Sequence, residues 1–153
     1  MTYFLVKLWR LMRGVPQWYV LWMFHDKFMV GVSGVIFDEE GRVLLLRHRY
    51  WWPGSWGLPG GYARRGEKLE ETLCREVKEE TGLDVQVVGF LRLVSGYKLR
   101  VEVNYVGRLL GGDLRLDARE VIEAAFFGVD DLPAGLLSSH REVIGLAVVA
   151  EKN

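Results

Sequence analysis

Residues 60–83 read GGYARRGEKLEETLCREVKEETGL, and they decide how the rest of the chain must be arranged. A helix is predicted over residues 69–81, because leucine and valine recur at every fourth position, including Leu73 and Val77. Gly82 follows directly, where a glycine in the left-handed conformation commonly ends a helix. The stretch is therefore a glycine-rich turn followed by one amphipathic helix.

Three glutamates of this helix lie on one face. Glu76, Glu79 and Glu80 are spaced i, i+3 and i+4, which brings their carboxylates together. Like charges at this spacing repel one another, and hard cations such as Mg²⁺ or Mn²⁺ would relieve the repulsion because they prefer oxygen ligands. The alternative is a solvated acidic face, which would need neither the helix stop nor the preceding turn. The pattern favours a metal site.

The spacing of the fixed residues in this stretch resembles a complete Nudix box. The resemblance implies an α/β fold, namely a Nudix-type α/β/α sandwich with a mixed β-sheet and the box as a loop–helix–loop. It also implies a hydrolase that splits a nucleoside diphosphate linked to another moiety, such as a nucleoside di- or triphosphate, a nucleotide sugar or an ADP-ribose-like compound. The matching positions are Gly61, Glu67, Arg75, Glu76, Val77, Glu79, Glu80, Gly82 and Leu83.

The resemblance also implies roles for the box residues. Glu76, Glu79 and Glu80 are expected to be catalytic and to ligate Mg²⁺ or Mn²⁺, with either Glu79 or Glu80 as an alternative general base acting through a bound water. The carbonyl of Gly60 is expected to be a further metal ligand. The structural positions of the motif are expected to be Gly61, Glu67, Arg75 and Gly82.

Another catalytic acid is expected from beyond the box. Family members commonly place it before an aromatic pair and a Leu-Pro turn, and both Glu120 and Glu123 precede such a pair at residues 126–127. Glu123 is nearer to the aromatic pair and is the preferred candidate, with Glu120 in reserve.

Three residues are candidates for binding substrate. Arg47 and Arg49 end a predicted strand near the returning glycine-rich turn, where the family commonly sets a basic residue against substrate phosphate. A solvated strand end is an equally good interpretation. Trp56 belongs to a segment that resembles the one that precedes the box in family members. Trp51 and Trp52 could stack on a nucleobase, although such residues more often cover the edge of a core.

Length and composition indicate one globular domain without a nucleic-acid partner. The chain has 153 residues, enough for a single core, and its 20 basic residues are balanced by 20 acidic ones. Cys74 is the only cysteine, which excludes an internal disulfide and fits a reducing, cytoplasmic compartment. The expected partner is a small nucleotide-type substrate.

The segments around the box predict strands and one more helix. Residues 28–50 are predicted to form one hairpin, and residues 84–110 a second hairpin around Ser95-Gly96. A further strand is predicted over residues 120–129, and a closing helix over residues 140–152. Strands on both sides of a central helix predict a mixed-sheet α/β domain.

Residues 1–27 are predicted to form an apolar helical arm ahead of a hydrolase domain at residues 28–153. Basic residues recur every three positions along one side of a first helix, and Pro16 is placed to open a second. The longest charge-free run has 11 residues, well short of the roughly 20 that span a bilayer. The arm could pack on the domain, form a homodimer contact or lie on a membrane surface, and the first two are favoured because apolar helices are usually core or interface.

Two functions remain open beside the hydrolase. A Nudix domain can serve as a nucleotide-binding or sensor module, although such members often lose a box glutamate and this chain keeps all of them. The arm alone suggests a membrane-surface hydrolase of a lipid-linked diphosphate. The box does not name the substrate, and Leu99 stands where ADP-ribose hydrolases often carry proline.

Overall fold

The computed structural model describes residues 2–151, and within them the chain forms four helices and one six-stranded sheet. The sheet order is β4-β5-β1-β2-β6, and β3 pairs with part of β1. The elements are α1 (Thr2–Leu11), α2 (Val15–Phe24), β1 (Met29–Phe37), β2 (Val43–His48), β3 (Gly60–Tyr62), α3 (Leu69–Thr81), β4 (Asp84–Val94), β5 (Arg100–Gly111), β6 (Val121–Phe127) and α4 (Ser138–Glu151).

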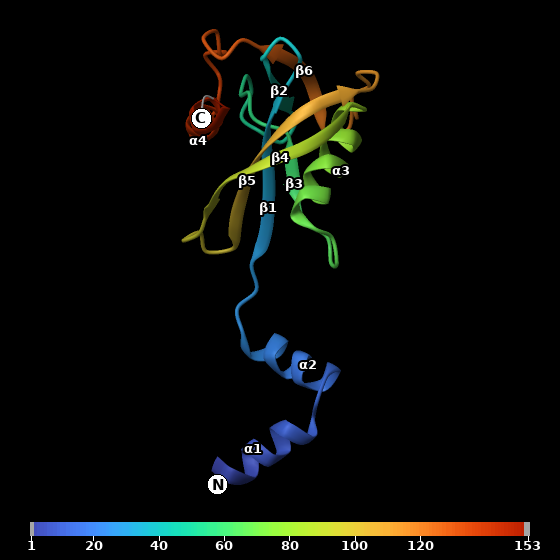
Figure 1. The fold of residues 1–153 in the computed structure, drawn as a ribbon, viewed down its shortest axis with the longest axis vertical. Helices are drawn as coiled ribbons and strands as arrows, with labels where there is room; N and C mark the ends of the chain where they lie inside the picture. The colour runs from blue at the N-terminus through green and yellow to red at the C-terminus, as the bar shows by residue number, and fades with distance from the viewer. Residues whose placement is uncertain (1, 152–153) are drawn as a thin grey trace.

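The two faces of the sheet carry separate apolar cores, one under each of the two domain helices. In β2, Leu44 and Leu46 belong to the core that contains α3, whereas Leu45 belongs to the core that contains α4. This alternation follows from the two-residue repeat of a strand and makes both faces apolar. Figure 1 shows α3 and α4 on opposite sides of the sheet. The predicted α/β sandwich with a mixed sheet is confirmed, since β1 runs parallel to β5 while the other pairs are antiparallel.

Helix α3 has the bounds that the sequence predicts. The Lys68 backbone N–H donates a hydrogen bond to the Glu71 carboxylate, which satisfies one free amide at the helix start. Gly82 ends the helix with φ 76°, a conformation that residues with a side chain rarely adopt. Leu73 and Val77 are fully buried against the sheet, so the predicted apolar stripe is the packed face.

One of the two predicted hairpins is paired differently from the prediction. Strands β4 and β5 form the second hairpin as expected. Strands β1 and β2 are antiparallel but pair only at Phe37 and Val43, next to their turn. The reason is that β3 occupies the same edge of β1 at residues 31–33, so β2 turns away and pairs with β6 along its length.

The arm forms the two predicted helices and extends away from the domain, as Figure 1 shows. Helix α2 has no buried residue, and most of its large apolar side chains are exposed. The Gln17 side chain donates a hydrogen bond of 2.7 Å to the Trp9 carbonyl and so links the two helices. No helix within residues 2–151 has the length and apolarity needed to cross a bilayer.

Candidate active site

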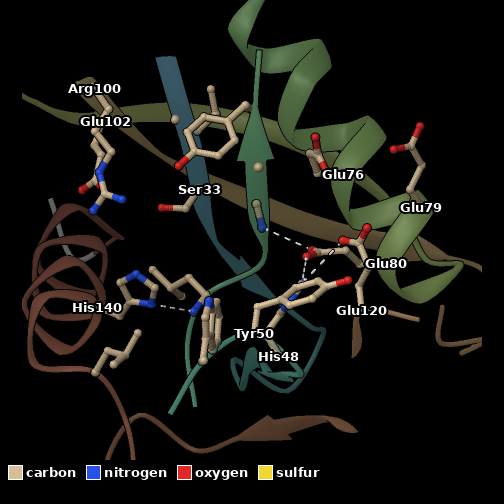
Figure 2. Close-up of a pocket in the computed structure, with 18 of the residues that line it drawn as sticks. Ser33, His48, Tyr50, Glu76, Glu79, Glu80, Arg100, Glu102, Glu120 and His140 are labelled. Carbon is tan, nitrogen blue, oxygen red and sulfur yellow. Dashed lines mark hydrogen bonds and ion pairs between the residues drawn. The ribbon is translucent and has the colours of Figure 1, made fainter. Parts of the chain in front are cut away.

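A cavity of about 880 Å³ lies beside α3, where strands β1 and β3 meet the helix. Its other walls come from the β4–β5 hairpin at residues 97–102, the loop at residues 117–120 and the start of α4. In Figure 2 the α3 glutamates lie on one side of this cavity, and His140 of α4 lies on the other. The residues of the stretch 60–83 that line it are Gly60, Gly61, Tyr62, Arg64, Glu76, Glu79 and Glu80.

Glu80 is the most confined of the three α3 carboxylates, with only 5% of its surface exposed. Its Oε1 lies 3.1 Å from His48 Nε2, and its Oε2 accepts a hydrogen bond of 3.3 Å from the Gly60 N–H (Figure 2). Burial raises the pKa of Glu80, and the hydrogen bond to His48 partly opposes that rise. The same bond raises the pKa of His48. Strands β2 and β3 therefore hold this carboxylate in one orientation.

His48 also connects the α3 site to the loop before β6. Its Nε2 lies 3.9 Å from Glu120 Oε2, and its ring stacks at a tilt on Trp51 with centroids 5.2 Å apart. Among the described residues, the buried His48 Nδ1 finds no hydrogen-bond partner. The His48 ring therefore lies between Glu80 and Glu120 at the cavity wall, with its Nε2 toward both acids.

Arg75 donates hydrogen bonds to three other acids of the box. Its Nε donates to Glu67 at 2.7 Å, and its Nη1 donates to Glu76 at 2.6 Å and to Glu79 at 3.1 Å. This guanidinium lowers the pKa of Glu67 to about 2, and Glu67 in turn raises the pKa of Arg75. Glu79 is also paired with Arg64, at 3.0 Å. Arg75 therefore fixes the spacing of these three glutamates.

Close approach explains the glycine at position 61. A Cβ there would collide with the Glu76 carboxylate, so any side chain would displace that acid. Because Gly61 has no side chain, strand β3 can lie close to α3 at this point, with the Glu76 carboxylate beside it.

The donor set suits a hard cation, but the carboxylates do not converge on one point. Within residues 2–151, no three His, Cys, Asp or Glu side chains lie close enough together to ligate one metal ion. Glu76 and Glu79 point to guanidinium groups and Glu80 to His48, so each acid already has a positive or polar partner. Three carboxylates that line one cavity are nevertheless the oxygen ligands that Mg²⁺ and Mn²⁺ prefer.

Four of the predicted catalytic and substrate-binding residues lie outside the lining of the cavity. Arg47 pairs with Glu123 at 2.9 Å across β2 and β6, and its guanidinium lies over the Trp56 ring. Trp56 packs edge-to-face on Phe127 beside the core under α4. The remaining member is Arg49, which donates to the Ala118 carbonyl at 3.0 Å.

The alternation of strand side chains accounts for this separation. Consecutive strand residues point to opposite faces, so Arg47 and His48 cannot both reach the cavity. The ladder places Arg47 opposite Glu123, and a register shift follows before His48. His48 and Glu120 line the cavity, whereas Arg47 and Glu123 do not. The preference for Glu123 over Glu120, which depended on distance along the chain, is therefore not matched by this geometry.

The sequence interpretation missed two histidines at the cavity. His48 could have been identified from the strand repeat, because it neighbours Arg47 and projects from the other face. No local pattern in the sequence indicated that His140 lies at the cavity. Its Nδ1 accepts a hydrogen bond of 2.8 Å from the Leu58 N–H, and burial, followed by the charges of Arg100 and Arg92, lowers its pKa to about 4.

Comparisons with known proteins agree on one family. The family described as NUDIX domain matches residues 27–146. ADP-ribose pyrophosphatase of Methanocaldococcus jannaschii is 33% identical over 122 residues, which cover 75% of this chain and 70% of that protein. NAD-capped RNA hydrolase NudC of Vibrio atlanticus is 30% identical over 96 residues, 62% of this chain, so the chain spans only 36% of that protein.

A solved structure gives the same result for the fold. The crystal structure of an ADP-ribose pyrophosphatase from Streptococcus suis aligns with a TM-score of 0.69 and 28% identity. The alignment covers 82% of this chain and 92% of that one. The similarity therefore extends over nearly the whole of the solved chain.

Proposed function

This chain belongs to the Nudix hydrolase family as a Nudix pyrophosphohydrolase, and from that premise we propose that it cleaves the pyrophosphate bond of a nucleoside diphosphate linked to a second moiety. The observation that carries the proposal is the cavity, where Glu76, Glu79 and Glu80 meet two further polar residues, His48 and Glu120. Acids on a rigid helix are suited to phosphoryl chemistry because they position charge with little reorganisation.

Glu80 is the proposed general base. A carboxylate that accepts a proton must be positioned and must have a pKa closer to neutrality than usual. Glu80 meets both requirements, since His48 and Gly60 orient it and burial raises its pKa. His48 is proposed as a positioning residue, because its contact is with Glu80.

Glu76 and Glu79 are the proposed principal ligands of Mg²⁺ or Mn²⁺, with Glu80 and the Gly60 carbonyl as the remaining oxygen donors. When bound, such an ion would neutralise phosphate charge and lower the pKa of water. Arg64 pairs with Glu79, and Arg75 pairs with Glu76. Arg75 keeps a structural role through Glu67, whereas Arg64 is exposed and free to move toward substrate phosphate.

Glu120 is proposed as the additional acid in place of Glu123. It lines the cavity and its carboxylate lies 3.9 Å from His48 Nε2, on the same side as Glu80. Glu123 is half exposed and paired with Arg47, so Arg47, Arg49 and Trp56 are better explained as parts of the sheet edge and core.

The cavity supports a substrate with two parts. Its volume of about 880 Å³ lies in the upper part of the roughly 300–1,000 Å³ that small-molecule sites occupy. Arg100, with its guanidinium over the Tyr97 ring at 5.1 Å, lines the end away from α3. Two of the similar proteins are described as ADP-ribose pyrophosphatases, so ADP-ribose is the first compound to test, followed by nucleotide sugars and nucleoside triphosphates.

The test is a product assay over these three substrate classes, with Mg²⁺, with Mn²⁺ and with a chelator. At least one class should give a nucleoside monophosphate and a phosphorylated product, and the chelator should abolish turnover. Glu80→Gln should lower kcat at least ~100-fold, the low end of a general-base contribution. Glu70→Gln is the matched control, because it lies on the same helix outside the cavity lining.

Two results would refute the proposal. Tight nucleotide binding without turnover of any class would identify a binding or sensor module. Near-wild-type kcat in Glu80→Gln would exclude Glu80 as the base.

A further inference from the structure

Helix α2 presents apolar side chains to solvent around most of its circumference. It contains no charged residue, and Trp18, Trp22 and Phe24 are 72%, 63% and 77% exposed. A helix that is apolar on all sides is normally surrounded by protein or lipid, because soluble monomers rarely expose a contiguous apolar surface of this kind. This exposed apolar surface is therefore a candidate docking surface.

Helix α1 is amphipathic and differs from α2 in carrying positive charge. Lys7 and Arg10 lie along one edge of it, and apolar side chains such as Phe4, Leu8 and Leu11 cover much of the rest. Lys7 lies over the Tyr3 ring at 5.5 Å, so part of the basic edge is held beside an aromatic side chain. An amphipathic helix with a basic polar edge suits an interface between water and an apolar phase.

The charge of the arm opposes that of the domain. Residues 2–27 contain four Lys or Arg and one Asp, an excess of three positive charges. Since the whole chain has 20 basic and 20 acidic residues, the remainder has an excess of three negative charges. The positive charge is thus concentrated in the segment that also exposes the apolar surface.

The rim of the α2 surface is also basic. A groove of about 720 Å³ runs along α2, and Arg65 from the turn before α3 lines its edge. In the segment that follows the helix, Lys27 Nζ lies 4.7 Å from the centre of the Trp22 ring. Tryptophan flanked by Lys or Arg is the arrangement found at the headgroup level of a bilayer.

We propose that α1 and α2 form a docking surface for an anionic lipid bilayer, on which both helices lie flat. Each helix has 10 residues, or about 15 Å, half of a hydrocarbon core of roughly 30 Å, so neither can span it. A second copy of the arm would carry the same excess of three positive charges, so it would offer no complementary charge to the basic residues. A lipid surface takes up the apolar side chains of α2 that face it, and its anionic headgroups attract the basic edge at the same time.

The test is flotation of the full-length protein with vesicles of phosphatidylcholine and phosphatidylglycerol, compared with phosphatidylcholine alone. Partitioning should be at least ~10-fold stronger on the anionic vesicles and should weaken at high ionic strength. Trp18→Ser with Trp22→Ser should lower it at least ~10-fold on both vesicle types. Lys7→Glu with Arg10→Glu should lower it on the anionic vesicles only.

The matched control is Leu93→Ser with Leu110→Ser, which removes two exposed apolar side chains from β4 and β5 and should float like the wild type. Circular dichroism and thermal melting establish that every variant is folded. The proposal is overturned if the tryptophan variant floats like the wild type, or if no vesicle binds the wild type. It is also overturned if light scattering shows a wild-type dimer that the tryptophan variant converts to a monomer, because a second copy would then cover α2.

Discussion

Acidification should destabilise this protein through His140. The native state holds His140 neutral, since its Nδ1 accepts a hydrogen bond from the Leu58 N–H and burial lowers its pKa from 6.5 to about 4. In the unfolded chain the same imidazole takes up a proton near pH 6.5. Between these two values the unfolded state binds more protons than the native state, so stability rises with pH.

The magnitude follows from the gap between the two pKa values. Each pKa unit corresponds to about 1.36 kcal/mol, so the stabilisation due to neutral His140 is at most about 3 kcal/mol. It is fully present above pH 6.5, declines as the pH falls, and is lost below about pH 4. Partial exposure of the ring makes the measured value smaller.

The assay is urea unfolding of the wild type and of His140→Asn over this pH range. Asparagine offers a carbonyl oxygen near the position of Nδ1 and does not titrate, so its hydrogen bond with Leu58 would not depend on pH. The wild type should be the more stable protein at pH 7.5, and its advantage should shrink by up to about 3 kcal/mol by pH 4. Ser138→Asn, at an exposed position two residues earlier, controls for the added amide. A wild-type advantage that stays constant across the range would refute the assignment of a neutral, buried His140.

Three further outcomes are expected. Leu73→Ala should lower the free energy of unfolding by roughly 2–5 kcal/mol in urea titrations, because Leu73 is fully buried between α3 and the sheet, and a loss below about 1 kcal/mol would contradict that packing. Gly61→Ala should reduce kcat far more than stability, since its Cβ displaces the Glu76 carboxylate; a melting temperature that falls with unchanged kcat would oppose this. Glu120→Gln should reduce kcat more than Glu123→Gln in the same assay, and the reverse order would return the catalytic role to Glu123.

Much of the fold could be predicted because it depends on local patterns. The bounds of α3 follow from the leucine and valine repeat and from Gly82, and both signals act within a few residues. The hairpin of β4 and β5 likewise involves neighbouring segments. The pairing of β1 with β5 is not local: it joins residues about 70 positions apart, and it depends on β3 occupying the other edge of β1. No periodicity within residues 28–50 contains that information.

The residues of the site likewise differ in whether local spacing was enough to predict them. Glu76, Glu79 and Glu80 share a helix, so their common face could be predicted from spacing alone. The choice between Arg47 and His48, and between Glu123 and Glu120, required the register of β2 against β6. His140 could not be predicted at all, because it reaches the cavity only through the packing of α4 on the far face of the sheet.

Within α3 the acids differ in how firmly they are held, and this difference has a consequence for catalysis. Glu80 is tied to two strands through His48 and Gly60, so its orientation changes only if the sheet moves. Glu79 is tied to Arg64, whose side chain is 62% exposed and is therefore free to leave. A cation held by these acids would have to compete with the Arg64 guanidinium for Glu79, and with His48 and the Gly60 N–H for Glu80. If substrate phosphate draws Arg64 away from Glu79, metal binding and substrate binding should each strengthen the other.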